Sequence, residues 1–118
     1  MTLGERSRYY ERMGLDQSVL NEIKNRILSV TMPRRVILFG SAAKGTMTPD
    51  SDIDILVLED HPVSLRREGV RIGNALRGLG YPFDIVVMST ERFEETKPVI
   101  GGLAYPANKG GIVIYEAA

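Results

Sequence analysis

The stretch that decides the fold reads Gly40-Ser41-Ala42-Ala43-Lys44-Gly45, then five further residues, then Ser51-Asp52-Ile53-Asp54-Ile55-Leu56-Val57. A short apolar run over residues 36–39 precedes it and stops at Gly40, which is typical of a buried strand. The acidic stretch predicts a second strand over residues 52–58. In that strand Ile53, Ile55 and Val57 share one face, and Asp52 and Asp54 lie on the other. Residues 41–44 are predicted to form a single helical turn between the two strands, because serine is a good N-cap and alanine favours helix.

The remaining pattern alternates helices and strands. Apolar residues at helical spacing predict a helix that Asp16 caps and that ends before Pro33. Ser64 is predicted to cap a second helix that runs to about Leu79, and Ser89 or Thr90 to open a third. Further strands are predicted over residues 83–88 and 112–115. This order predicts a small mixed α/β domain of the α+β kind, with a mixed sheet of three or four strands and helices packed on one side.

Length and composition narrow the class of protein. A chain of 118 residues is most simply one domain, here residues 15–118, preceded by an N-terminal arm or short helix over residues 1–14. The 15 basic and 15 acidic residues cancel, so direct nucleic-acid binding is not predicted. No run is long enough to cross a membrane, residues 1–14 lack the apolar segment of a secretory signal, and there is no cysteine. We therefore expect a cytoplasmic protein whose metal ligands are oxygen atoms or the single His61.

The central motif carries the residue types that phosphoryl-transfer chemistry needs. A Gly-Ser turn can hold a phosphate on backbone N–H groups. Asp52 and Asp54 stand two residues apart and can hold a divalent cation between them. Asp84 begins a later strand, and a neighbouring strand lies only about 4.8 Å away, so its carboxylate could complete the cluster. Three crowded acids repel one another unless a cation neutralises them, which favours a metal site.

Each part of the motif has an ordinary structural explanation when taken alone. Gly40-Ser41 would usually be a plain strand-to-turn junction, the Asp52/Asp54 pair a solvated strand edge, and Asp84 a surface acid. At residue frequencies of about 5–7%, however, the spacing Gly-Ser, ten residues, Asp-x-Asp arises in about one chain of this length in a thousand. The joint pattern therefore favours a functional site.

The same residues resemble the signature of the polymerase-β-like nucleotidyltransferases, and at this length the minimal nucleotidyltransferases in particular. The resemblance implies that Gly40 and Ser41 hold the nucleotide triphosphate, with Lys44 and Ser51 also in the nucleotide site. It implies that Asp52 and Asp54 bind two Mg²⁺ ions, and that Asp84 binds the catalytic metal and helps to activate the attacking hydroxyl. Position 44 is usually arginine in this signature. Lysine keeps the charge but loses the two-pronged phosphate contact, so we expect weaker or differently oriented phosphate binding.

The resemblance also implies a function. The chain is expected to transfer a nucleoside monophosphate, AMP from ATP, to a hydroxyl group. Larger relatives carry an additional acceptor-binding domain for which this chain has no room. Minimal relatives are commonly paired with a helical HEPN-type toxin, and some attach AMP to a tyrosine of it (AMPylation), which implies an antitoxin.

Two alternatives stay open: an antitoxin that neutralises its partner by occlusion, and a two-chain enzyme that modifies a small aminoglycoside-like molecule. Assembly with itself or with another chain, the NTP and the acceptor are not decided by the sequence.

Overall fold

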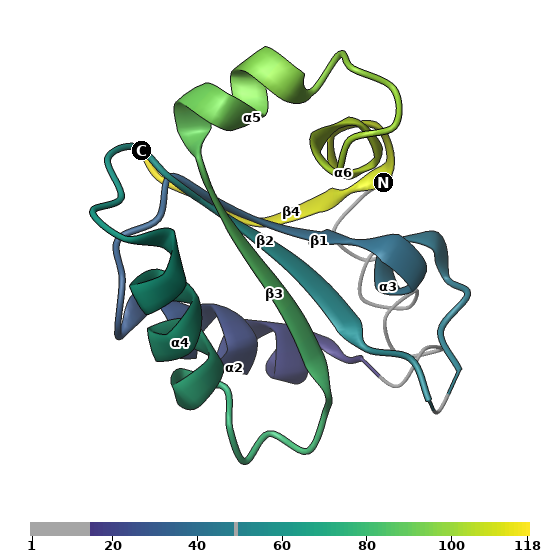
Figure 1. Cartoon of the computed structure of the whole chain (residues 1–118). Coiled ribbons are helices and arrows are strands. Elements are labelled where there is room, and N and C mark those ends of the chain that lie inside the picture. Colours follow the sequence, from purple (N-terminus) through teal and green to yellow (C-terminus); the bar gives the residue numbers. More distant parts are fainter. Residues whose placement is uncertain (1–14, 49) are drawn as a thin grey trace.

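The computed structural model of the chain describes residues 15–48 and 50–118, so the predicted arm over residues 1–14 lies outside the described residues. Helices and strands alternate along the chain (Figure 1). In chain order they are α2 (Gln17–Leu28), β1 (Arg35–Phe39), α3 (Gly40–Lys44), β2 (Ile53–Glu59), α4 (Leu65–Ala75), β3 (Phe83–Ser89), α5 (Thr90–Thr96), α6 (Ala104–Gly110) and β4 (Ile112–Glu116).

The strands form one mixed sheet in the order β3-β2-β1-β4. Strand β1 is antiparallel to both of its neighbours, whereas β2 and β3 are parallel. A parallel pair needs a crossover connection, and α4 provides it. The predicted α/β class with a small mixed sheet is confirmed.

Side-chain caps begin α2, α4 and α5 at the positions that the sequence predicts. The Asp16 carboxylate accepts a hydrogen bond from the Val19 amide at 2.9 Å, which satisfies one of the free N–H groups in the first turn of α2. Ser64 and Ser89 act in the same way for α4 and α5. Helix α4 ends at Ala75, earlier than predicted, and the chain then turns through two glycines of positive φ before β3.

The hydrophobic core has two parts, one on each face of the sheet. Helices α2 and α4 lie side by side on one face, and the shorter α5 and α6 cover the other (Figure 1). On the α2/α4 face the buried side chains include Ile23, Ile27, Val36, Ile55 and Ile72. On the opposite face they are Ile37, Leu56, Leu58, Phe93, Ala104 and Ala107. The prediction of helices on one side is therefore incomplete, because it describes only the α2/α4 layer.

Helix α6 was not predicted. Its seven residues include Pro106, and glycines stand on both sides of it, so the sequence is typical of a loop. Pro106 falls in the first turn, where its missing N–H group has no partner to lose. Burial of Ala104 and Ala107 against the sheet holds the helix in place.

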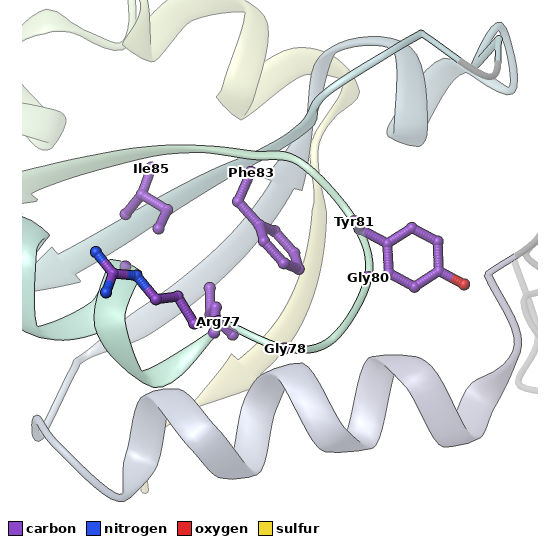
Figure 2. Close-up of a pocket in the computed structure, with 8 residues that line it drawn as sticks. Arg77, Gly78, Gly80, Tyr81, Phe83 and Ile85 are labelled. Atoms are coloured by element: carbon purple, nitrogen blue, oxygen red, sulfur yellow. The ribbon is translucent and has the colours of Figure 1, made fainter.

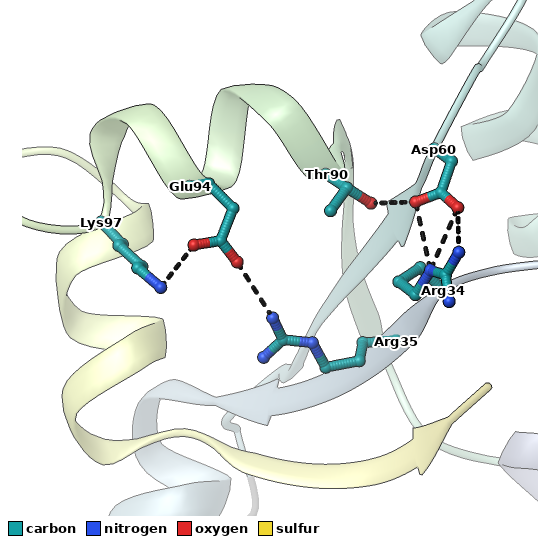
Figure 3. Close-up of polar contacts among 6 residues, drawn as sticks. All are labelled: Arg34, Arg35, Asp60, Thr90, Glu94 and Lys97. Carbon is teal, nitrogen blue, oxygen red and sulfur yellow. Dashed lines mark hydrogen bonds and ion pairs between the residues drawn. The ribbon is translucent and has the colours of Figure 1, made fainter. Parts of the chain in front are cut away.

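Polar contacts join the start of β1 to α5 and to the loop after β2 (Figure 3). The Arg34 guanidinium donates from Nε to Asp60 Oδ2 at 3.0 Å, and Thr90 Oγ1 donates to Asp60 Oδ1 at 2.8 Å. Next to them, Arg35 Nη2 lies 3.4 Å from Glu94 Oε1. The other carboxylate oxygen of Glu94 pairs with Lys97.

Within the described ranges, no helix has both the length and the apolar character that crossing a bilayer requires.

Candidate active site

The backbone of Gly40 lies directly against the carboxylate of Asp54. Phe39, the last residue of β1, is opposite Asp54 in the antiparallel ladder, so the chain passes Asp54 as it turns into α3. Gly40 has φ +67°, and a Cβ atom placed on it would be 2.1 Å from Asp54 Oδ2. Only glycine fits here, because the turn needs a left-handed backbone and the carboxylate occupies the side-chain position.

Asp54 and Asp84 lie level with each other on adjacent strands. They are direct partners in the parallel ladder of β2 and β3, and adjacent strands are about 4.8 Å apart. Since side chains alternate along a strand, Asp54 shares its face with Leu56 and Leu58, which is the face that α5 and α6 cover. Asp52 comes just before the first residue of β2, one position outside the strand that the sequence predicts to begin there. All three acids therefore stand at one end of the sheet.

The negative charges of Asp84 and Asp52 act on the Asp54 carboxylate. Asp54 is partly buried, and this burial raises its pKa above the ordinary aspartate value; the negative charges of Asp84 and, to a smaller degree, Asp52 raise the pKa further. Asp52 and Asp84 themselves are exposed. A bound cation would remove this repulsion.

The donor set fits a hard divalent cation, since carboxylate oxygens are the ligands that Mg²⁺ prefers. In the described ranges, however, no group of three or more histidine, aspartate or glutamate side chains converges closely enough to hold a metal ion as it lies. A metal shared by all three aspartates therefore requires at least one of their side chains to move.

The turn after Gly40 is closed by its own backbone. The Ser41 carbonyl accepts hydrogen bonds from the Gly45 and Thr46 amides, the latter at 3.0 Å, which ends α3 after one turn. Lys44, the last residue of α3, is exposed. The Ser51 hydroxyl accepts a hydrogen bond from the Thr48 amide at 2.9 Å, so it stabilises the loop before the acidic strand. The roles of Ser41, Lys44 and Ser51 toward a nucleotide stay predictions.

Helix α6 borders this site, and the sequence analysis missed it. It contacts both α3 and β1, on the sheet face that carries Asp54 and Asp84. The signal that could have revealed it is the pair Ala104 and Ala107, two small apolar residues at helical spacing.

A separate cavity of about 480 Å³ lies on the opposite side of β3 (Figure 2). Its walls include Leu76 from the end of α4 and Phe83 and Ile85 from β3, the two residues that flank Asp84 and point away from it. The hydroxyl group of Tyr81 points away from the labelled side chains in Figure 2. None of the three acids lines this cavity.

Comparison with known proteins identifies the family of this chain. The family model of the nucleotidyltransferase domain matches residues 18–105, which is most of the chain and includes Gly40 and all three aspartates. The chain belongs to the nucleotidyltransferase domain family. Comparison with curated protein sequences gives no match.

Two solved structures share the fold of this nucleotidyltransferase domain. One is a proposed nucleotidyltransferase from Sulfolobus solfataricus, with a TM-score of 0.56 and 20% identity over 82% of this chain and 78% of that one. The other is a toxin–antitoxin structure with AMP-PNP, with a TM-score of 0.55 and 21% identity over 83% of this chain and 73% of that one. At this identity the likeness concerns the fold alone.

Proposed function

We propose that this chain is a Mg²⁺-dependent enzyme that transfers AMP from ATP to a hydroxyl group of a partner protein. The observation that carries the proposal is the contact between Gly40 and the Asp54 carboxylate, level with Asp84 on the next strand. It joins the glycine–serine turn, the candidate phosphate site, to the acids of the candidate metal site. Membership in the nucleotidyltransferase family supports the class of reaction.

We assign the metal ligands to the three aspartates. Asp52 and Asp54 would hold two Mg²⁺ ions and Asp84 would hold one of them, after at least one of these side chains has moved. Magnesium held there would supply positive charge against the triphosphate and the leaving pyrophosphate. In the reaction the acceptor oxygen bonds to the α-phosphorus of ATP. The bond between that phosphorus and the oxygen that bridges it to the β-phosphorus breaks, and pyrophosphate leaves. We assign to the Asp84 carboxylate the task of taking the hydroxyl proton.

The triphosphate would lie along the Gly40–Lys44 turn. Gly40 and Ser41 offer backbone N–H groups, and the exposed Lys44 ammonium offers a positive charge. Ser51 could join them only after its hydroxyl leaves the Thr48 amide. Lys44 makes a single-point contact where an arginine would make two, so we expect weak nucleotide binding.

The proposed acceptor is a tyrosine of a HEPN-type toxin, which would make this chain an antitoxin. Two observations support a protein acceptor. Asp84 is exposed and lies on an edge strand, where a large molecule can reach it, and one structure of the same fold is a toxin–antitoxin structure with AMP-PNP. A small aminoglycoside-like acceptor would instead need a second chain to enclose it.

The test uses this chain, labelled ATP, Mg²⁺ and the protein encoded next to it. We expect the mass of the neighbour to rise by one AMP, and mass spectrometry of its peptides to place the group on a tyrosine. Asp54→Asn should reduce transfer about a thousandfold or more, because metal binding supplies several kcal/mol of transition-state stabilisation. Asp50→Asn, a change of an exposed acid in the loop before the acidic strand, is the matched control and should keep transfer. Transfer that survives Asp54→Asn, or that is lost equally in the control, would contradict the proposal.

The occlusion alternative is separated by a double variant. If Asp52→Asn combined with Asp54→Asn still binds and neutralises the partner, the chain acts by covering it. If the variant binds but no longer neutralises, transfer of the nucleotide is the cause.

A further inference from the structure

A buried glutamate, Glu59, and a partly buried one, Glu68, lie together at the end of β2 that is remote from Asp54. Glu59, the last residue of β2, is only 8% exposed, and the side chain of Glu68 in the first turn of α4 is 16% exposed. Their carboxyl groups lie within hydrogen-bonding reach of each other. Oε2 of each is buried and has no hydrogen-bond partner among the described residues. A buried polar atom without a partner calls for an explanation.

The neighbouring charges do not balance this pair. The guanidinium of Arg71 on α4 reaches Glu68 Oε1 at 3.6 Å, a long and mostly exposed contact. Thr31, between α2 and β1, donates a hydrogen bond to Glu59. Asp60 is already held by Arg34 and Thr90. A cavity of about 460 Å³ adjoins the two glutamates, lined by Val30, Thr31, Met32, Glu59, Asp60, His61, Glu68 and Arg71.

Two carboxylates in contact can be stabilised by a cation or by a proton between them. The two free oxygens are buried, so a metal ion or an ammonium group could not reach them unless the side chains moved apart. A proton needs no such space. One proton would also leave one negative charge on the pair, which the single guanidinium of Arg71 balances.

We propose that Glu59 and Glu68 share a proton and thereby form a pH-sensitive latch between the end of β2 and the first turn of α4. The pKa of Glu59 is shifted in the direction that this arrangement requires. Burial raises the pKa of Glu59 and the charge of Glu68 raises it further, whereas the hydrogen bond from Thr31 and the charge of Arg71 lower it. Because the pKa is raised in the folded state, the stabilisation is present at low pH and is lost as the pH rises through the folded-state value.

Loss of the shared proton would leave two charges in contact, so the first turn of α4 should separate from β2. Helix α4 is the crossover between the strands that carry Asp54 and Asp84. The latch would therefore loosen this connection at its start without touching the acids of the candidate active site. The inference does not depend on the proposed function.

Carboxyl-carbon NMR on the full chain, without nucleotide or metal, tests the latch. We expect the Glu59 carboxyl group to titrate with a midpoint above the ordinary glutamate value. Amide hydrogen exchange in the first turn of α4, corrected for the intrinsic pH dependence, should accelerate once the pH passes that midpoint. Titration of Glu59 at or below the ordinary glutamate value would overturn the proposal, as would a midpoint that Ca²⁺ displaces at millimolar concentration.

Variants separate the shared proton from the general stability of the fold. Glu59→Gln keeps a hydrogen-bond donor between the two groups but cannot titrate, so the pH dependence of exchange in α4 should disappear. Glu95→Gln, a change of an exposed glutamate on α5, should leave it as in the native chain. If Glu59→Gln does not fold, Glu68→Gln tests the same pair from α4. Unchanged pH dependence in a folded variant of either glutamate would overturn the proposal.

Discussion

At the level of single residues, the contact between Gly40 and Asp54 separates two reasons for requiring glycine. Gly40→Ala would place a methyl group in the left-handed region, which destabilises by about 1–2 kcal/mol. It would also push the Asp54 carboxylate out of its position, 2.1 Å from the new Cβ atom. We expect urea unfolding to show a larger loss of stability than backbone strain alone explains.

Gly80→Ala is the matched control for this prediction. Gly80 also has a positive φ, +87°, but nothing lies within 4 Å of an added Cβ atom. The Gly80→Ala variant should therefore lose only the stability that the left-handed backbone conformation costs an alanine. Equal losses in the two variants would show that the space beside Asp54 is not restricted.

At the level of the elements, two other glycines are predicted to respond in opposite directions. A Cβ atom on Gly73 in α4 would lie 3.9 Å from Ile85 Cδ1, an ordinary contact. Gly73→Ala should therefore stabilise the protein by about 0.5–1 kcal/mol, since alanine is the better helix former. On Gly111, which follows α6, the added atom would lie 2.1 Å from the Ala107 carbonyl oxygen and 2.6 Å from Ile37 Cγ2. Gly111→Ala should lose about 1–3 kcal/mol through overpacking.

Urea unfolding of both variants checks this pair of predictions. Gly111 has φ −72°, so its backbone conformation is open to alanine and crowding alone should decide the outcome. A change of the same sign in both variants would mean that the packing of α4 on β3 or of α6 on β1 differs from the structure described.

The elements also show what the sequence could predict. Helix starts are local events, and the capping residues Asp16, Ser64 and Ser89 could be identified from their own chemistry. The end of α4 was placed too late, because Leu76 is buried beyond the last helical residue and continues the apolar pattern. Helix α6 depends on its contact with the sheet, and the pair Ala104 and Ala107 is the one local signal of it, too short to set a helix apart from a glycine-flanked loop.

At the level of the whole molecule, Asp60 joins three segments that are distant in the sequence (Figure 3). The hydrogen bonds from Arg34 and Thr90 lower the pKa of Asp60 from 3.8 to about 2. Because the folded-state pKa is depressed, the stabilisation is complete above about pH 4 and is lost as the pH falls through about 2. Asp60→Asn should therefore lower the Tm at neutral pH and flatten its fall between pH 4 and 2. Thermal unfolding over this range checks the prediction, and a parallel fall in both proteins would contradict it.

The candidate site shows the same division between local and long-range information. The spacing of Gly40, Asp52 and Asp54 is local, and it was enough to predict the turn and the acidic strand. The position of Asp84 opposite Asp54 follows from the strand order and from the parallel register, which depend on the packing of α4 and are not written in any one segment. The hydroxyl of Ser51 was predicted only through a resemblance, and its hydrogen bond to Thr48 was not foreseen.

The parallel pairing of β2 with β3 has a consequence for sequence drift. In a hairpin the turn length would fix which residues face each other. Where a long crossover joins two parallel strands, the register is set by the hydrogen bonds and side-chain packing between the strands. Residues gained or lost in the loops on either side of α4 would change the outer surface of the domain, keep the packing of α4, and still leave Asp54 opposite Asp84. Related chains can therefore vary in the length of these loops while keeping their two acids aligned.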